Sequence, residues 1–320
     1  MDNKTLCSWE PNTDFTALKA RALLLNQIRQ FFFKQGVLEV ETPLIDCYSV
    51  TDPYTTAIPI RIDQRKLFMQ TSPEYAMKRL LASGSGAIFQ ICKAFRADEL
   101  STKHNTEFTM LEWYRPGFDH HKLIAEVDSL LQDIIDVGPA IKSSYKDLFK
   151  NFFDFDPHTV DLTTLRSTAE KNNIILSSSA AKNIKRADWH QLLMTHIIEP
   201  QLTGNSPWII YDYPVEQAAL ANIRNESPPV SERFEVYFNG LELANGYHEL
   251  TDATEQMKRF EQDCRDREQL RLAHMLPDIR LLQALKSGLP KCSGVAVGID
   301  RLLMAKEKII VISKVITFTL

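Results

Sequence analysis

The segment from Arg233 to Leu250, RFEVYFNGLELANGYHEL, constrains the fold more than any other. Its two strand-like runs flank Asn239-Gly240, a dipeptide typical of the two-residue turns that join antiparallel strands. Other apolar runs with strand character occupy 57–62, 66–70, 87–98, 107–116 and 292–299. Because these runs outnumber any alternating strand–helix rhythm, the sequence predicts an α+β fold in which a mostly antiparallel sheet is flanked by helices.

Helical patterns supply the flanking elements, at 14–35, 73–82, 120–137 and 251–273. In the first of them apolar residues recur near the helical period, and Gly36 ends the pattern. The stretch from 139 to about 205 has a mixed helical and irregular pattern, and 308–320 has the pattern of a strand. We therefore expect one domain over 14–320 that includes an insertion at 139–205, preceded by an N-terminal extension at 1–13.

Composition excludes several classes of protein. The chain has 37 basic and 41 acidic side chains, a net charge of −4, so it lacks the strongly basic surface typical of nucleic-acid binding. No apolar run exceeds four residues, whereas a membrane-spanning helix needs about 20. The five cysteines are scattered and form no disulfide framework. We expect a cytoplasmic protein without membrane segments.

The first candidate site is the strand–loop–strand unit FRADELSTKHNTEF, with Arg96, His104 and Phe108. An arginine guanidinium offers a planar fork for phosphate oxygens, and a phenylalanine ring is able to stack on a base. Taken alone, such a loop is more often a solvated hairpin loop.

The second candidate site is GLELANGYHEL, which carries Glu242, Asn245 and Glu249. Carboxylates are rarely buried without a cation, so this pair suits Mg²⁺, an ammonium group, or one of each. An equally good interpretation is that the two glutamates occupy exposed strand positions, which alternate with positions that face the core.

The third candidate site is GVAVGIDRLLM, a strand of small residues that runs into a helix. Glycine and alanine permit close approach of a ligand, and Arg301 at the junction is able to reach phosphate or stack on adenine. A tightly packed strand followed by a helix capped by Asp300 explains the same pattern.

The order of these motifs resembles the catalytic domain of class II aminoacyl-tRNA synthetases. FRADELSTKHNTEFTMLEWY is similar to the second signature motif of that class, and GVAVGIDRLLM to the third. The segment around VLEVETPLI is similar to the first, which builds the dimer interface around a proline such as Pro43. Within the class, the greatest similarity is to lysyl-tRNA synthetases, and it rests on the segments SPEY, HNTEFTMLEWY and ELANGYHEL. The resemblance implies the class II catalytic fold and a homodimer.

The bacterial lysyl-tRNA synthetases carry an N-terminal barrel that reads the anticodon, whereas this sequence enters the catalytic domain by about residue 14. The chain is therefore more similar to the free-standing family of elongation factor P lysine ligases, which attach (R)-β-lysine to a lysine side chain of elongation factor P. Ala296 supports this similarity, because lysyl-tRNA synthetases have glycine at that position. Ser72 supports it as well, because those enzymes usually have a small apolar residue there. The resemblance implies no binding of a tRNA anticodon.

The resemblance further implies an ATP-dependent ligase that uses Mg²⁺ and forms an amide through an aminoacyl-adenylate. The implied catalytic residues are Arg96, Glu242 and Arg301, and Glu242 is also the implied Mg²⁺ ligand. The implied ATP-binding residues are Arg96, Ala97, Asp98, His104, Asn105, Phe108, Glu242, Leu243, Gly298 and Arg301. The implied substrate-binding residues are Ser72, Pro73, Glu74, Glu112, Tyr114, Asn245, Glu249 and Ala296. Of these, Glu249 and Tyr114 take the distal ammonium of the lysine.

Three other functions remain open. The first is an enzyme similar to lysyl-tRNA synthetase that charges an RNA; the missing barrel and Ala296 argue against it. The second is a catalytically inactive paralogue that binds a nucleotide or an amino acid, although a decayed site is expected to have lost some of its charged residues. The third is a ligase similar to asparagine synthetase, which the Glu249–Tyr114 pair disfavours. Asp98 and Thr106 depart from the family pattern, where a longer acid and a proline are usual.

Overall fold

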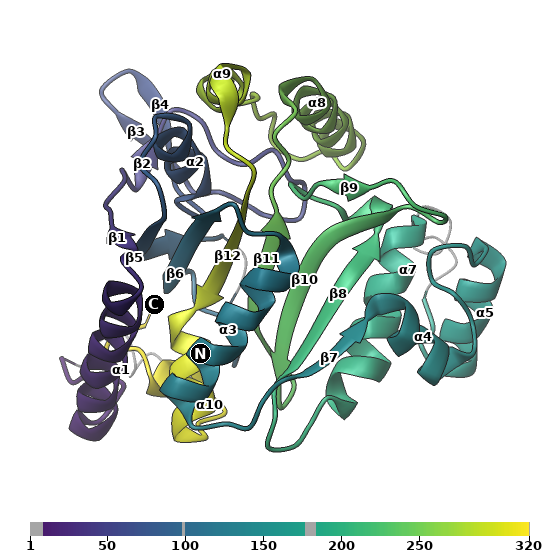
Figure 1. Ribbon diagram of the computed structural model, residues 1–320, viewed down its shortest axis with the longest axis horizontal. Helices are drawn as coiled ribbons and strands as arrows, with labels where there is room; N and C mark the ends of the chain where they lie inside the picture. The colour runs from purple at the N-terminus through teal and green to yellow at the C-terminus, as the bar shows by residue number, and fades with distance from the viewer. Residues whose placement is uncertain (1–8, 98–99, 177–183, 320) are drawn as a thin grey trace. The chain divides into compact units, whose positions relative to one another are not determined.

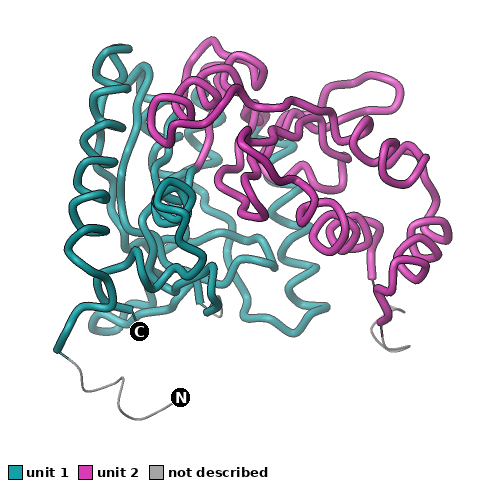
Figure 2. Tube along the Cα trace, turned by 90° about the horizontal axis from the view of Figure 1, so that it is seen from below, with its two compact units in different colours: residues 1–113, 253–289, 297–320 teal, residues 114–252, 290–296 magenta. Residues whose placement is uncertain are grey.

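The computed structural model describes residues 9–97, 100–176 and 184–319, and the chain divides into two compact units (Figures 1 and 2). Unit 1 comprises Met1–Trp113, Ala253–Leu289 and Val297–Leu320, and unit 2 comprises Tyr114–Asp252 and Pro290–Ala296. Two strands, β6 (Glu107–Pro116) and β12 (Cys292–Gly298), contribute residues to both units. Among the described residues, no helix combines the length and the apolar character that crossing a membrane requires.

Unit 1 combines two groups of strands with helices. The helices are α1 (Phe15–Lys34), α2 (Glu74–Ala82), α8 (Ala253–Gln269), α9 (Ile279–Gly288) and α10 (Ile299–Glu307). In the main sheet, β1 (Leu38–Glu39) runs parallel to β5 (Ile88–Phe95), which neighbours β6. A small antiparallel sheet has the order β2 (Ile45–Asp46), β4 (Arg65–Met69), β3 (Pro59–Ile62).

Helix α1 shows how the sequence builds the core of unit 1. The Asp14 side chain accepts a hydrogen bond from the Ala17 N–H at 2.8 Å and caps the helix. One face of the helix is buried through Leu24, Ile28 and Phe32. The Phe32 ring stacks on Phe89 of β5 with centroids 4.6 Å apart, which ties the helix to the sheet.

Unit 2 contains the remaining elements. Its helices are α3 (His120–Ile135), α4 (Tyr145–Phe153), α5 (Leu162–Lys171) and α7 (Arg186–Leu193), followed by a π-helical turn at Met194–Ile198. Its strands are β7 (Ile141–Ser144), β8 (Trp208–Pro214), β9 (Ile223–Arg224), β10 (Val230–Phe238) and β11 (Leu241–His248). The order in the sheet is β6, β12, β11, β10, β8, β7, with β9 on β10.

The predicted hairpin is the centre of unit 2. Strands β10 and β11 are antiparallel, and Asn239 and Gly240 between them both have positive φ angles, 49° and 73°. Two consecutive left-handed residues match the right-handed twist of paired strands, which explains the preference for Asn-Gly. The register pairs Glu235 with Asn245, and a bulge follows between Val236 and Tyr237. Because β10 is also antiparallel to β8 and β9, the predicted fold class is confirmed.

The predicted insertion at 139–205 is largely helical in its described part. Helices α4, α5 and α7 pack around a core of their own that also takes in Tyr213 of β8 and Tyr237 of β10. The segment starts with β7, which pairs in parallel with β8 and joins the insertion to the sheet.

The prediction of a strand at 308–320 is wrong. Helix α10 ends at Glu307, Lys308 adopts a left-handed conformation with φ 55°, and a 3₁₀ turn occupies Ile312–Lys314. Ile312, Val315 and Ile316 are all buried, so the buried apolar residues recur at the helical spacings of three and four instead of the alternation of a strand. Strand β8 and helix α9 were absent from the sequence-based prediction.

Candidate active site

Arg96 and Phe108, both predicted to bind ATP, lie together in unit 1. The Arg96 N–H donates to the Thr106 carbonyl at 2.9 Å across the loop between β5 and β6. The guanidinium lies 5.2 Å from the centre of the Phe108 ring. Its Nε is buried, and within the described residues it has no hydrogen-bond partner. A phosphate oxygen would satisfy this donor.

His104 and Arg301 are joined directly. The Arg301 guanidinium donates to Nε2 of His104, and Nδ1 of His104 lies 2.8 Å from the Ser101 hydroxyl. Burial and the nearby charges of Arg301, Arg96 and Lys103 lower the pKa of His104 to about 4. The imidazole is therefore neutral at pH 7, and its proton resides on Nδ1, because Nε2 must accept from arginine. Several cations thus surround this loop, as a polyphosphate ligand requires.

Other predicted ATP residues support the same loop. The buried Asn105 amide donates to the Glu107 carbonyl at 2.7 Å, and the Ala97 N–H donates to the Thr56 carbonyl at 2.8 Å. Asp98 lies outside the described residues. Gly298 is the N-cap of α10, and the nearest atoms to a Cβ there would be those of the Arg301 side chain, 3.8 Å away. Its role in binding ATP stays a prediction.

Four predicted substrate residues lie together around the start of α2. The Ser72 hydroxyl donates to Glu112 Oε2 at 2.8 Å and accepts from the Glu74 N–H at 3.0 Å. Glu112 is buried, and the buried Pro73 is the N-cap of α2. Ser72 thus fixes the Glu112 carboxylate and the first turn of the helix at once.

Lys78 is a residue that the sequence analysis missed. Its ammonium lies 2.6 Å from Glu74 Oε1, one helical turn earlier, and the side chain is 2% exposed. The spacing of four residues was the available signal, but a lysine in a helical pattern normally lies on the surface. The Glu74 carboxylate therefore has a cation partner within the chain itself.

In unit 2, Tyr114 and Glu249 meet at Gly294, which the sequence analysis did not single out. A Cβ on Gly294 would lie 2.6 Å from Glu249 Oε1 and closer still to the Tyr114 ring. Real Cβ atoms do not approach other atoms so closely, so only glycine fits this position of β12. Both side chains are buried, Glu249 to 3% exposure. A buried carboxylate beside an aromatic ring is suited to an ammonium group.

The other predicted residues of unit 2 lie on β11 and β12. Glu242 is half-buried, Leu243 is buried, and Asn245 accepts a hydrogen bond from Arg233 at 3.3 Å. Ala296 is half-buried on β12. No group of three or more His, Cys, Asp or Glu side chains suited to a metal ion occurs among the described residues. A Mg²⁺ ion held by Glu242 would therefore need oxygens from its substrate, as Mg²⁺ commonly does.

The predicted site residues thus form two sets. Unit 1 contains Ser72, Pro73, Glu74, Arg96, Ala97, His104, Asn105, Phe108, Glu112, Gly298 and Arg301, and unit 2 contains Tyr114, Glu242, Leu243, Asn245, Glu249 and Ala296. The sets are joined through the strands that change unit, since Glu112 and Tyr114 are two residues apart on β6, as are Ala296 and Gly298 on β12.

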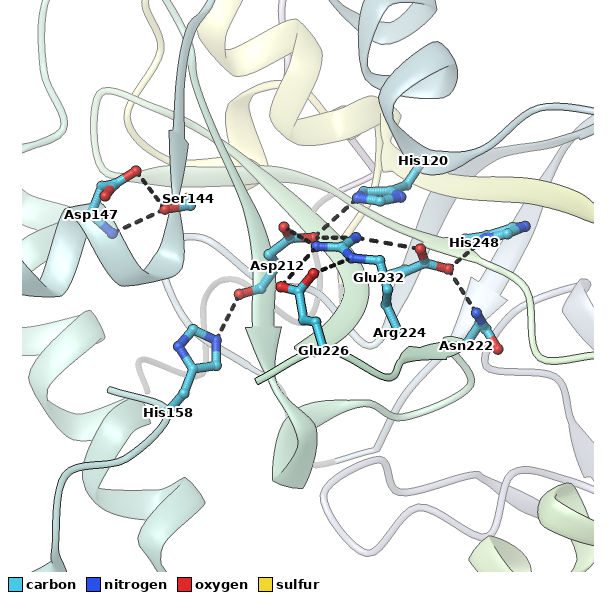
Figure 3. Close-up of polar contacts among 10 residues, drawn as sticks. All are labelled: His120, Ser144, Asp147, His158, Asp212, Asn222, Arg224, Glu226, Glu232 and His248. Carbon is cyan, nitrogen blue, oxygen red and sulfur yellow. Dashed lines mark hydrogen bonds and ion pairs between the residues drawn. The ribbon is translucent and has the colours of Figure 1, made fainter. Parts of the chain in front are cut away.

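A polar network in unit 2 fixes the strand that ends beside Glu249 (Figure 3). Arg224 of β9 forms ion pairs with Asp212, Glu226 and Glu232. Glu232 of β10 also accepts from Asn222 at 2.8 Å and pairs with His248, the residue before Glu249. The network thereby links strands β8, β9, β10 and β11 by side chains.

This network predicts acid sensitivity. Burial raises the pKa of Glu232, but the hydrogen bonds from His248 and Asn222 outweigh it and lower the pKa to about 2, from 4.5. Because the folded-state pKa is the lower one, the carboxylate stabilises the fold above about pH 4.5, and this contribution is lost as pH falls through 2. Glu232→Gln should reduce the free energy of unfolding by about 1–3 kcal/mol at pH 7. Urea unfolding at several pH values should show this difference shrinking below pH 4.5; a difference independent of pH would contradict the assignment.

Comparison with known proteins identifies the family. The model of the class II tRNA synthetases for D, K and N matches residues 7–320. The chain belongs to this family. The resemblance inferred from the sequence is confirmed, and with it the class II catalytic fold.

Within this family, the chain is similar to proteins of one particular name. An elongation factor P--(R)-beta-lysine ligase of Mannheimia succiniciproducens is 47% identical over 304 residues, which is 93% of each chain. Proteins of the same name from Pectobacterium atrosepticum and Salmonella paratyphi A are 47% and 46% identical over 318 residues, covering 98% of this chain and 97% of theirs. The predicted similarity to this group of ligases is confirmed.

Proposed function

We propose that the chain activates (R)-β-lysine with ATP and transfers it to the ε-amine of a lysine of elongation factor P. The observation that carries the proposal is the buried Glu249 carboxylate beside Tyr114, which suits the ammonium end of a lysine. The names of the similar ligases supply the acceptor and the β-amino acid. Such an enzyme would act in the cytoplasm, where translation factors work.

In the first step, a carboxylate oxygen of lysine attacks the α-phosphorus of ATP. The new P–O bond replaces the bond to the β-phosphate, and pyrophosphate leaves. Arg96 would hold the α-phosphate and the substrate carboxylate. Its side chain lies beside Phe108, and the Phe108 ring would stack on the adenine. Arg301, held by neutral His104, would cover the other face of the adenine. A Mg²⁺ ion on Glu242 would neutralise phosphate charge.

In the second step, the acceptor amine attacks the carbonyl carbon of the adenylate. A C–N bond forms, the C–O bond to phosphate breaks, AMP leaves, and the amine loses a proton. No covalent bond to the enzyme is needed, so catalysis depends on positioning and charge stabilisation. Ser72, Glu74 and Glu112 would surround the second amino group of the β-lysine, with Lys78 balancing the extra negative charge.

The same proposal includes a homodimer. Helix α1 exposes three large apolar side chains, Phe15, Leu23 and Phe33, each more than 60% accessible. Leu38 of β1 is exposed as well. A second copy of the chain would cover these residues, and the mass in solution, measured by light scattering, tests this.

The experiment that tests the function is lysine-dependent exchange of pyrophosphate into ATP. It should be run with (R)-β-lysine and L-α-lysine in parallel, with Mg²⁺ present. A clear preference for β-lysine, followed by mass addition to elongation factor P, supports the proposal. Exchange with α-lysine alone would favour an RNA-charging enzyme, and no exchange from folded protein would favour the inactive paralogue.

Ala296→Gly should shift the preference toward α-lysine. The methyl group of Ala296 is half-buried on β12, and lysyl-tRNA synthetases, according to the resemblance, have glycine there. One carbon group in an apolar pocket changes discrimination by about 10- to 200-fold, and because Ala296 is only half-buried we expect the low end, about tenfold. The ratio of exchange rates for the two lysines measures it, and an unchanged ratio would contradict a role of Ala296 in the pocket.

A further inference from the structure

The side-chain amide of Asn245 is fixed from one side by Arg233. The two residues lie on neighbouring strands, where Arg233 pairs with Tyr247 and Glu235 pairs with Asn245. Alternate residues of a strand share a face, so these four side chains emerge on the same side of the sheet. From there, Nε of Arg233 donates to Oδ1 of Asn245 at 3.3 Å along the diagonal of the ladder.

Arg233 has little freedom of its own. One terminal nitrogen donates to the Gln217 carbonyl at 2.8 Å, and the other pairs with Glu235. The guanidinium also lies over the Tyr213 ring, 4.8 Å from its centre. The neighbouring Glu235 carboxylate raises the pKa of Arg233 against the effect of burial, so the side chain stays charged. All three of its nitrogens are thus engaged.

Glu235 in turn is anchored in the core. Its second oxygen accepts hydrogen bonds from the hydroxyls of Tyr213, at 2.7 Å, and Tyr237. Both tyrosines belong to the core formed with α4, α5 and α7. The chain of contacts therefore runs from this core through Glu235 and Arg233 to Asn245.

This arrangement determines which way the amide faces. Arginine has donors and no acceptor, so the atom of Asn245 that faces Arg233 must be the oxygen. The Nδ2 group then faces away from Arg233. Asn245 is left to bind a ligand as a hydrogen-bond donor, which suits a carboxylate oxygen and disfavours an ammonium group.

We propose that Arg233 is a positioning residue that orients the Asn245 amide as a donor toward the substrate carboxylate. The inference rests on the proposed function, because it needs lysine as the ligand. The same contacts connect the 139–205 insertion to Asn245, because its core includes the tyrosines that hold Glu235.

A double-mutant cycle tests whether Arg233 acts through Asn245. Arg233→Lys keeps a charge beside Glu235, so no buried carboxylate is left unpaired, but a single ammonium does not reproduce the fork of three donors. Arg233→Lys and Asn245→Ala should each raise the KM for lysine in pyrophosphate exchange by about tenfold, with the KM for ATP unchanged. The double variant should equal Asn245→Ala alone. Additive effects, or an unchanged KM in Arg233→Lys, would overturn the proposal.

Arg186→Lys is the matched control. Arg186 of α7 lies in the same unit, donates to the Pro157 carbonyl at 2.5 Å and pairs with Glu216, and neither contact involves Asn245. This variant should lower the melting temperature and leave the KM for lysine unchanged. A rise in KM equal to that of Arg233→Lys would show a general structural effect and overturn the proposal.

A second measurement does not depend on activity. In ¹⁵N-labelled protein, the side-chain amide signal of Asn245 is identified by its loss in Asn245→Ala. It should shift in Arg233→Lys and stay unchanged in Arg186→Lys; an unchanged signal in Arg233→Lys would overturn the proposal. If the wild type shows no exchange with any lysine, the proposed function fails, while this spectrum still reports on the Arg233–Asn245 contact.

Discussion

Glu249→Gln should raise the KM for lysine by about thirtyfold or more, while the protein stays folded. Glutamine has nearly the same shape as glutamate, so the packing against Tyr114 and Gly294 survives. The substrate ammonium, however, would be buried beside a neutral amide, and loss of one partner of a buried charge pair costs about 2–5 kcal/mol. Pyrophosphate exchange at increasing lysine concentrations measures the change.

Glu170→Gln is a suitable control for this experiment. Glu170 forms an exposed ion pair with Arg166 on α5, and exposed pairs contribute little to stability. This variant should behave as the wild type in exchange and in thermal unfolding. If Glu249→Gln kept the wild-type KM, Glu249 would not bind the ammonium, and the proposed orientation of the substrate would be wrong.

Gly294→Ala should abolish exchange and lower the free energy of unfolding by about 1–3 kcal/mol. The new methyl would overlap the Tyr114 ring and lie 2.6 Å from Glu249 Oε1, so both side chains must move. Since both are buried, movement disturbs the core as well as the predicted ammonium site. Urea unfolding and exchange, measured on the same preparation, separate the two effects.

Gly138→Ala gives the matched comparison for Gly294→Ala. The same methyl in the same unit would meet the hydroxyl of Ser206 at 2.9 Å, the end of a side chain that is able to rotate. Its effect on stability should be smaller, and exchange should persist. Full activity in Gly294→Ala would mean that Tyr114 and Glu249 do not need their present positions.

The hairpin and the order of motifs could be predicted because their signals are local. Asn239-Gly240 determines the turn by its own backbone preferences. Trp208–Pro214 was missed because a short apolar run without alternation is compatible with a strand or a buried helix. The run after Lys308 has strand-forming residues, yet a 3₁₀ turn buries them. Tertiary packing decided both cases.

The site residues also divide into those that the sequence alone could predict and those that depend on tertiary structure. Arg96, Glu249 and Arg301 belong to motifs that are recognisable in the sequence. Gly294 and Arg233 depend on which strands are neighbours and in which register, and the bulge after Val236 shows that the register is not a simple count along the hairpin. Such partners become visible only when the strands are paired.

The division of the chain into units also has a consequence for its synthesis. Unit 2 takes its last piece from Pro290–Ala296, and unit 1 its last piece from Val297–Leu320. A nascent chain leaves the ribosome from the N-terminus, and domains usually fold as they emerge. Here unit 2 is incomplete until Ala296 has been added, and unit 1 still lacks Val297–Leu320 at that point. The growing polypeptide must therefore keep β6 from Pro116 onward, and β11 from His248 onward, without their common neighbour β12 until Cys292 has been added. During this period the unpaired strand edges are open to pairing with another chain.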